Sequence, residues 1–397
     1  MRTLRKQIPK NLFAAFVAAT MAGTALGQEQ SAAPGVFEDR ILFGQSAAFE
    51  GPAQELGRSM QAGILAAFKE INDQGGVHGR RLELRSLNDS YEPDKAIANT
   101  RQLIEEDVFA LIGAVGTPTS KAVVPVTEEN PIPYLAPMTG AEFLRDNAHH
   151  TVINLRASYY QETEEMVKRL TVDRKIKRIA ILYQDDSFGR AGLRGVLRAL
   201  EKRKLFAIGT GVFSRNTVAI KTALLDLKAV KPEAVIIIGP YQPTATFIKW
   251  AHRLGMESAV FMTLSFVGSN ALAKELGTEG DGVVVTQVVP FPTGDTVPVS
   301  ALYRAALKAY DPSITPGFIS FEGYLGGRLA IYALQQCGEK VDRDCIHSAL
   351  RSGRDINLDG FILRFGKYDN QGSDRVFLTA IGPDGQYMPL TTLPSRR

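Results

Sequence analysis

Short apolar runs alternate along the chain with segments in which apolar side chains recur every three or four residues. Residues 56–71 show the helical spacing clearly, and their pattern ends at Gly75-Gly76, which predicts an amphipathic helix. The run from Val235 to Ile238 is apolar without alternation, as is typical of a strand covered by helices on both faces. The repeated exchange of these two patterns predicts strands and helices in turn.

The predicted strands fall into two groups. The first comprises 40–44, 81–87, 108–112, 133–136 and 151–155, and the second comprises 178–183, 206–211, 234–238, 260–262 and 282–288. Because strands that alternate with helices form parallel sheets with right-handed crossovers, each group predicts a doubly wound α/β domain. Ligands of such domains bind beyond the carboxyl ends of the strands. The chain then continues with predicted helices at 299–310, 318–337 and 342–351 and strands at 361–365 and 376–381.

One strand-to-helix corner, residues 111–120, has features of a binding loop. The strand ends at Gly113, and Gly116 precedes Thr117 and Pro118. Threonine is a good N-cap, and proline suits the first helical position because its missing N–H needs no partner. The free N–H groups and the helix dipole favour an anion at such a corner. We therefore predict that this corner holds the acidic end of a small ligand.

The N-terminal 27 residues have the composition of a secretory signal peptide. A basic head of four Arg and Lys residues precedes an apolar stretch at 11–26, and Ala25-Leu26-Gly27 fits a cleavage site. The stretch is too short for a comfortable membrane span, and no cysteine follows it to carry a lipid. Removal of these four charges takes the net charge from +4 to about 0. The sequence thus predicts an exported, soluble, periplasmic protein that binds neither nucleic acid nor an anionic membrane.

The two cysteines, Cys337 and Cys345, enclose a polar segment of seven residues. In an oxidising compartment this spacing predicts a small-loop disulfide. Two free thiols are the alternative, and a metal site would need further ligands at short spacing.

Motifs for catalysis, cofactors and metals are missing from the sequence. None of the five histidines lies in a metal-ligand pattern, and no Gly-x-Ser-x-Gly elbow surrounds a serine nucleophile. The segment 112–117 has only two of the glycines of a dinucleotide-binding loop. We therefore predict a protein that is not an enzyme and that uses no cofactor or metal.

Several segments together resemble a known family. They are Phe43-Gly44-Gln45-Ser46-Ala47, Gly51-Pro52-Ala53, residues 71–80 (Ile-Asn-Asp-Gln-Gly-Gly-Val-His-Gly-Arg), residues 88–96 (Asn-Asp-Ser-Tyr-Glu-Pro-Asp-Lys-Ala) and Ile112-Gly113. In this order they are similar to the type I periplasmic binding proteins of ABC transporters, in the leucine/isoleucine/valine-binding and amide-binding group. The resemblance covers essentially all of the chain after residue 27.

The resemblance implies two Rossmann-like lobes joined by three crossings of a hinge, near 154–158, 288–291 and 357–360. Lobe 1 would then comprise 28–155 plus 290–356, and lobe 2 would comprise 156–289 plus 357–397. Such a monomer closes around an amino acid, an amide or a carboxylic acid and delivers it to the membrane subunits of an ABC permease. The open alternatives are a receptor that signals to a membrane sensor and a secreted nucleotide-dependent enzyme.

The resemblance also implies ligand-binding residues in lobe 1. Family members hold the ligand carboxylate with the hydroxyl and amides at the position of Thr117, beside Gly116, and a second loop corresponds to Thr139 and Gly140. Each threonine has a structural alternative. Thr117 can cap its helix, and Thr139 can form a capping box with Glu142.

In lobe 2 the implied ligand contacts are aromatic. Phe188 occupies a turn in which relatives carry tyrosine, and Tyr241 follows a buried strand in Gly239-Pro240-Tyr241. Packing between lobes is the alternative for Phe188, whereas no helical or strand pattern accounts for Tyr241.

The clearest departure from the family is at Ser265, where amino-acid binders place an acid for the ligand ammonium. A buried ammonium without an acid is costly. Glu322 takes over this role if it points into the cleft; otherwise the ligand has no α-amino group, and Glu322 is a structural residue. Arg156, beside the hinge, either binds a carboxylate or braces the hinge.

Overall fold

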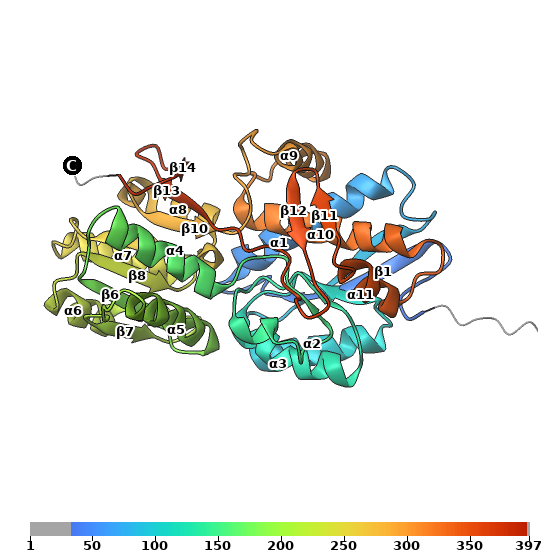
Figure 1. Ribbon diagram of the computed structural model, residues 1–397, viewed down its shortest axis with the longest axis horizontal. Coiled ribbons are helices and arrows are strands. Elements are labelled where there is room, and N and C mark those ends of the chain that lie inside the picture. The colour runs from blue at the N-terminus through green and yellow to red at the C-terminus, as the bar shows by residue number, and fades with distance from the viewer. Residues whose placement is uncertain (1–32, 395–397) are drawn as a thin grey trace, which may run out of the picture. The chain divides into compact units, whose positions relative to one another are not determined.

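Residues 33–394 are described by the computed structural model, and their strands form two open sheets and one hairpin (Figure 1). The predicted signal peptide lies outside these residues. The first sheet is five-stranded and parallel, in the order β2-β1-β3-β4-β5. Its strands are β1 (Arg40–Ala47), β2 (Arg81–Asn88), β3 (Ala110–Ile112), β4 (Tyr134–Leu135) and β5 (Val152–Ile153).

The helices that accompany the first sheet come from two parts of the chain. Between its strands lie α1 (Gln54–Asn72), α2 (Pro93–Glu105), α3 (Thr117–Glu129) and the short helix η1 (Glu142–Arg145). The later helices are α9 (Pro298–Tyr310), α10 (Phe318–Cys337) and α11 (Arg343–Leu350). Helices α1 and α10 pack closely, because Gly63 and Gly323 have no side chain: a Cβ on Gly63 would lie 1.9 Å from the Ser320 carbonyl oxygen.

The second sheet has seven strands in the order β14-β13-β10-β9-β8-β6-β7. Five of these strands pair in parallel: β6 (Ile179–Gln184), β7 (Thr210–Phe213), β8 (Ala234–Ile238), β9 (Val260–Thr263) and β10 (Val284–Gln287). Strand β13 (Phe377–Ile381) pairs antiparallel with β10, and β14 (Tyr387–Leu390) pairs antiparallel with β13. The accompanying helices are α4 (Tyr159–Val172), α5 (Ser187–Glu201), α6 (Lys221–Ala229), α7 (Tyr241–Arg253), α8 (Ser269–Leu276), η2 (Ser265–Val267) and η3 (Gly277–Gly280). Every residue of β8 is buried, as its unbroken apolar run predicts.

The two doubly wound α/β lobes predicted from the sequence are confirmed, but one strand lies elsewhere. The strand predicted at 206–211 begins only at Thr210. The preceding residues instead form the turn that follows the end of helix α5. In this turn Lys204 has φ +56°, and the Leu205 N–H donates to the Leu200 carbonyl. Phe206 is 82% exposed, so its apolar side chain belongs to a surface turn.

Three segments lead from one sheet to the other. The first, 154–158, follows β5, and the second, 288–297, follows β10. The third, 365–376, follows the hairpin of β11 (Asp355–Leu358) and β12 (Phe361–Arg364) and hydrogen-bonds to Asn154. This third segment starts later than the predicted 357–360, because the hairpin is held at α9, where the Val299 N–H donates to the Asp359 carbonyl. The lobe boundaries themselves stay a prediction.

The disulfide between Cys337 and Cys345 is present and joins the end of α10 to α11. Cys337 is the last residue of α10 and Cys345 lies in the first turn of α11, where the Asp342 carboxylate accepts the Cys345 N–H at 2.7 Å. Among the helices of residues 33–394, none combines the length and apolar character needed to cross a bilayer.

Candidate functional site

A buried arginine links elements of the two sheets. Arg156 lies in the segment between β5 and α4 and has no exposed surface. Its Nη2 lies 3.0 Å from Glu162 Oε1, and its Nη1 lies 3.4 Å from Glu322 Oε2. Glu162 belongs to α4, beside the second sheet, and Glu322 belongs to α10, which packs on α1. The arginine therefore holds two acids that come from different lobes.

Glu162 is fully hydrogen-bonded by its surroundings. Its Oε1 accepts from Arg156 Nη2 and from Ser265 Oγ at 3.0 Å. Its Oε2 accepts from the Ser265 N–H at 2.9 Å and from Thr286 Oγ1 at 2.7 Å. Four donors satisfy the lone pairs of a carboxylate. Glu162 thus stands beside Ser265, where the family resemblance implies an acid.

Glu322 has a poorer set of partners. Among the described residues, only Arg156 Nη1 donates to its carboxylate, at 3.5 and 3.4 Å to the two oxygens. Burial raises the pKa of Glu322, while the charge of Arg156 acts in the opposite direction. Burial also acts to lower the pKa of Arg156, but the charges of Glu322 and Glu162 outweigh it and the pKa is raised. The guanidinium therefore stays charged and neutralises both acids in part.

Three hydroxyl groups meet beside this ion cluster. Thr117 Oγ1 and Thr139 Oγ1 lie 2.7 Å apart, at the carboxyl ends of neighbouring strands β3 and β4. Burial raises the pKa of the Tyr159 hydroxyl, while the charge of Arg156 and the nearby hydroxyls of Thr139 and Thr117 act to lower it. The Tyr159 hydroxyl completes no hydrogen bond, and neither does Arg156 Nε. Buried polar groups normally have partners, so two unpaired donors in one place are a signal of a binding site.

Aromatic rings enclose the same region. The ring of Phe188, which is fully buried, lies 4.5 Å from that of Phe266 and 5.5 Å from that of Tyr159. Tyr91, from the loop after β2, lies 6.0 Å from Phe266. Asp186 positions Phe188 by accepting the N–H groups of residues 188 and 189, which caps α5. The arrangement offers an apolar wall next to unpaired hydrogen-bond donors.

The structure corrects the structural alternatives for both threonines. Helix α3 begins at Thr117 itself, its N-cap is Gly116 at φ +106°, and no side chain caps it. Thr139 forms no capping box, because η1 starts after Ala141, whose N–H donates to Thr139 Oγ1 at 3.3 Å. In both cases the hydroxyl turns to the other threonine instead. Gly116 is required, because a Cβ there would lie 2.2 Å from the Tyr91 ring.

Gly140 also lies against the site, at a position where a side chain would clash. A Cβ on Gly140 would come within 2.6 Å of the Tyr159 ring, and the Gly140 carbonyl accepts the Tyr159 N–H at 2.6 Å. The sequence-predicted residues that the structure brings together are thus Gly116, Thr117, Thr139, Gly140, Arg156, Phe188, Ser265 and Glu322.

Tyr241 stands apart from this group. It is the first residue of α7, is 3% exposed and lies beside Gly268, whose Cβ would be 3.4 Å from its ring. Burial raises its pKa to about 12, with the backbone of Glu55 in α1 as a hydrogen-bond neighbour. Tyr241 therefore contacts the other lobe, and its contact with ligand stays a prediction.

Sequence reasoning missed Glu162, Tyr159 and Phe266. The pairing of Glu162 with Arg156 could not be predicted from helical spacing, because Arg156 precedes the first residue of α4. The one available signal was Ser158, which together with Gln161 forms the capping box of α4 and so places Glu162 in the first turn.

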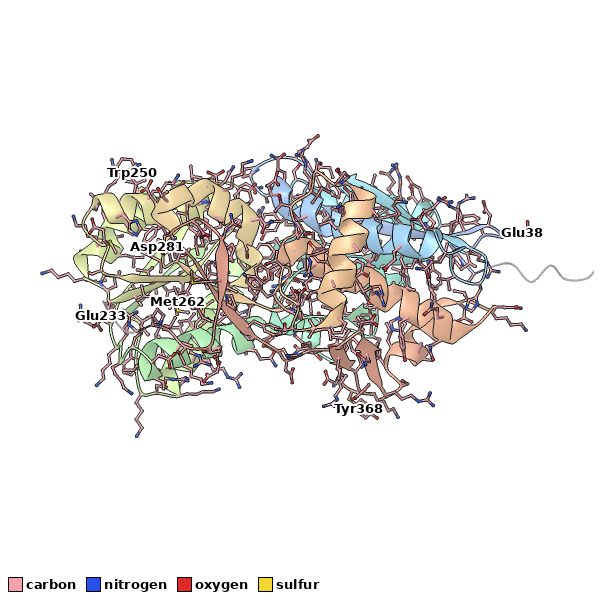
Figure 2. The ribbon with its side chains drawn as sticks, turned by 90° about the horizontal axis from the view of Figure 1, so that it is seen from above. Glu38, Glu233, Trp250, Met262, Asp281 and Tyr368 are labelled. Atoms are coloured by element: carbon pink, nitrogen blue, oxygen red, sulfur yellow. A yellow bond between two sulfur atoms is a disulfide. The ribbon has the colours of Figure 1, made fainter. Side chains whose placement is uncertain are left out.

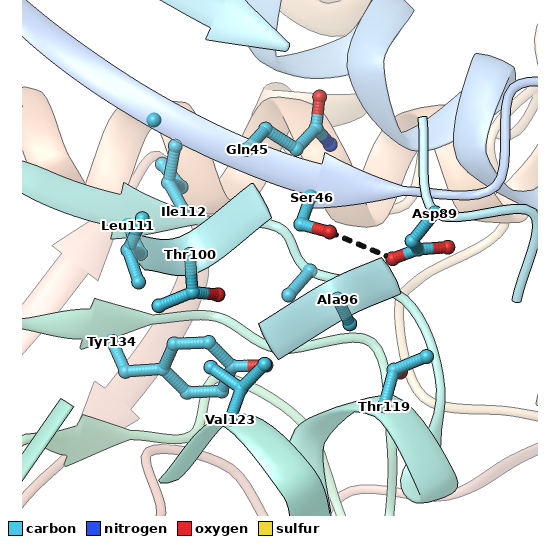
Figure 3. Close-up of a pocket in the computed structure, with 12 residues that line it drawn as sticks. Gln45, Ser46, Asp89, Ala96, Thr100, Leu111, Ile112, Thr119, Val123 and Tyr134 are labelled. Atoms are coloured by element: carbon cyan, nitrogen blue, oxygen red, sulfur yellow. Dashed lines mark hydrogen bonds between the residues drawn. The ribbon is translucent and has the colours of Figure 1, made fainter. Parts of the chain in front are cut away.

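Two hollows elsewhere are poorer candidates. A cavity of about 10 Å³ between β1, β3 and helices α2 and α3 has room for about one water molecule (Figure 3). A groove of about 410 Å³ between α6 and α7 is apolar and includes Trp250, which lies on the outer surface (Figure 2). Neither has an unpaired buried side-chain donor among its lining residues. Within residues 33–394, no cluster of three His, Cys, Asp or Glu residues is placed to hold a metal.

Two doubly wound lobes with unpaired buried donors between them define a ligand-binding protein of the two-lobed type. The chain belongs to the periplasmic binding protein family, whose model matches residues 41–386. This family consists of extracytoplasmic solute-binding proteins and not of enzymes, and it works with ABC transporters. The resemblance, the fold class and the solute-binding role predicted from the sequence are confirmed.

Three similar proteins illustrate the relationship. The Leu/Ile/Val-binding protein homolog 7 of Brucella abortus (strain 2308) is 25% identical over 401 residues, which cover 97% of this chain and 96% of that protein. The structure of a possible leucine/isoleucine/valine-binding protein from Rhodopirellula baltica SH 1 is 35% identical, with a TM-score of 0.85 over 89% of this chain and 96% of that one. A fatty acid ABC transporter substrate-binding protein from Thermomonospora curvata shares the fold at 21% identity, with a TM-score of 0.81 over 90% and 93%.

Proposed function

We propose that the protein captures a small organic ligand between its two lobes and delivers it to the membrane subunits of an ABC permease. The observation that carries this proposal is the pair of unpaired donors, Tyr159 Oη and Arg156 Nε, buried between elements of both sheets. A ligand that supplies their partners stabilises the state in which the lobes are closed. The ligand classes in question are amino acids, amides and carboxylic acids.

Contacts between the lobes support a mechanism of hinge closure. The Gln184 side chain in β6 donates to the Tyr91 hydroxyl at 3.4 Å, and Arg215 Nη2 lies 2.7 Å from Glu92 Oε2. These contacts join surfaces that separate when the three hinge segments bend. Because a ligand that touches both lobes has a higher affinity for the closed state, it shifts the population towards closure.

The remaining parts of the proposal concern location and assembly. We propose that cleavage near Gly27 releases the protein to the periplasm as a monomer. The ligand contacts in the proposed site are Gly116, Thr117, Thr139, Gly140, Arg156, Phe188, Tyr241, Ser265 and Glu322. The lobes predicted from the sequence comprise 28–155 plus 290–356 and 156–289 plus 357–397, and the contact of the β11–β12 hairpin with α9 favours assigning residues 357–364 to lobe 1.

A thermal-shift screen tests the binding role. The protein from residue 28 is unfolded and refolded to remove carried-over ligand, then mixed with amino acids, amides and carboxylic acids. A ligand that binds only the folded state raises the melting temperature by mass action. We expect at least one strong shift, confirmed by calorimetry with one site per chain. A melting temperature that no compound of the panel changes would contradict the proposal.

A further inference from the structure

We infer that the ligand is a carboxylic acid without an α-ammonium group, with an apolar body that packs on the buried aromatic rings. This inference rests on the proposed function and names the ligand class of the same site. Its basis is the balance of hydrogen-bond donors and acceptors between the lobes.

Two buried donors of the site lack partners. Tyr159 Oη and Arg156 Nε are both buried and unpaired, and they lie on side chains in mutual contact, with the Arg156 guanidinium carbon 5.9 Å from the Tyr159 ring centre. Arginine nitrogens donate and never accept, so Nε needs an acceptor atom. A carboxylate supplies acceptors to both groups and makes the stronger, charge-assisted bond with the guanidinium. An ammonium supplies donors alone, so it leaves Arg156 Nε without an acceptor.

The acids of the site are already engaged. The four donors to Glu162 leave its oxygens no capacity for a ligand ammonium. Glu322 has spare lone pairs, but its two oxygens lie 3.5 and 3.4 Å from Arg156 Nη1. An ammonium that reached Glu322 would therefore lie next to a guanidinium of the same charge.

A second arginine completes the charge balance. Arg145 Nη2 donates to the Arg156 carbonyl at 3.0 Å, and Nη1 donates to the carbonyls of Thr139 and Ala141 at 3.3 and 3.0 Å. Burial lowers its pKa to about 10, which leaves it charged at neutral pH. The charges of Arg145 and Arg156 therefore face Glu162 and Glu322, with the charge of Glu142 also acting on Arg145.

The apolar side of the site accounts for the rest of the ligand. The ring of Phe266 lies between two others, with its centroid 4.5 Å from that of Phe188 and 6.0 Å from that of Tyr91. All three side chains are buried. Thr117 and Thr139 stand at the N-terminus of α3 and the end of β4, next to the Tyr159 hydroxyl. A carboxylate at the hydroxyls therefore places an aromatic or branched alkyl body against the rings.

Matched pairs of compounds test the inference. Calorimetry measures 3-phenylpropanoate against L-phenylalanine and 4-methylpentanoate against L-leucine, which differ by the α-ammonium alone. We expect each acid to bind at least about tenfold more tightly than its amino acid, a difference of about 1.4 kcal/mol. Equal binding, or tighter binding of the amino acids, overturns the inference while the proposed solute-binding function stands. If no compound of either series binds, the inference fails, while the broader thermal-shift panel decides the proposed function.

Substitution of the unpaired hydroxyl gives the second readout. Tyr159→Phe removes a hydroxyl whose neighbours within the protein are the hydroxyls of Thr117 and Thr139, so the melting temperature of the unliganded protein changes little. The affinity for the tighter acid falls about tenfold, because a bond to the carboxylate is lost. The matched control is Tyr160→Phe, the same change on the next residue, whose ring centre lies 5.2 Å from the Arg198 guanidinium carbon. Undiminished acid affinity in Tyr159→Phe contradicts the placement of the carboxylate.

Discussion

Two buried acids, Glu162 and Asp89, show two ways of placing a carboxylate in the interior. Both side chains have no exposed surface. Glu162, between the lobes, is paired with Arg156 and three further donors. Asp89, after β2 in the first lobe, has neutral partners, the Ser46 hydroxyl and the Tyr91 N–H, both at 2.8 Å (Figure 3). Burial raises the pKa of Asp89 to about 6.

The comparison separates two consequences of burial. An acid with a cation partner ties together the elements that supply the pair. An acid with neutral partners makes the protein sensitive to pH instead. Glu162, between the lobes, is therefore paired with a charge, whereas Asp89, in the interior of lobe 1, is not.

The largest effect on stability is expected when the Glu162 carboxylate is removed. Glu162→Gln leaves Arg156 buried with Glu322 as its one acid, and loss of one partner from a buried ion pair costs about 3–5 kcal/mol. Urea denaturation measures the free energy of unfolding of each variant. The control is Glu164→Gln on the same helix, whose carboxylate pairs with Lys202 and Arg203 near the surface and contributes under about 1 kcal/mol. Equal losses in the two variants would show that Glu162 is not an anchor between lobes.

The Asp89 side of the comparison predicts a difference in pH dependence. The raised pKa means that the protonated form is favoured in the folded state, so its stabilising contribution is complete below about pH 4 and is lost as pH rises through about 6. The shift from 3.8 to about 6 corresponds to roughly 3 kcal/mol. Asp89→Asn removes this dependence. Unfolding free energies of the two proteins, measured from pH 4 to pH 8, should diverge by this amount, and parallel curves would contradict the account.

A third substitution asks whether the ligand reaches beyond the Arg156 region. Tyr241→Ala is expected to weaken ligand binding at least about tenfold, or 1.4 kcal/mol, without unfolding the protein. The side chain is buried and faces the other lobe near Gly268. Calorimetry with the best ligand of the screen measures the effect, and Tyr310→Ala on the surface of α9 is the control. An unchanged affinity would confine the binding site to the residues around Arg156 and Tyr159.

The smallest effect is expected at the rim between the lobes. Arg215 and Asn216 both contact Glu92 at 2.7 Å, but the side chains of Glu92 and Arg215 are 40% and 25% exposed. Exposed ion pairs contribute about 0.2–1 kcal/mol, and salt screens them. Glu92→Gln should therefore weaken ligand binding by less than a factor of about five, and only at low salt. A large loss that persists at high salt would place the main lobe contact at the rim.

The sequence predicted the fold well because the fold depends on local patterns. The apolar run of β8 and the repeated strand-helix exchange are visible in the chain, and both lobes follow from them. The failure at β7 has a local reason too, since the apolar Phe206 lies in an exposed turn. Only the third segment between the sheets depended on a distant contact, that of the β11–β12 hairpin with α9.

The candidate site could be predicted only in part. Gly116 was visible at the strand-to-helix corner and Gly140 was implied by the family resemblance, but the partner rings of Tyr91 and Tyr159 were not predicted. Thr117 was predicted to cap its helix, whereas its hydroxyl contacts Thr139, 22 residues later. The role of Ser265 was predicted as the loss of an acid. The structure shows that an acid from another helix, Glu162, has taken that place, which no spacing in the chain reveals.

A crystal structure of the protein with bound 3-phenylpropanoate tests the central claim most directly. The account predicts the carboxylate within hydrogen-bond distance of the Tyr159 hydroxyl and the Arg156 Nε, and the phenyl ring against Phe188 and Phe266. A ligand bound elsewhere, for example in the groove beside Trp250, would contradict the account.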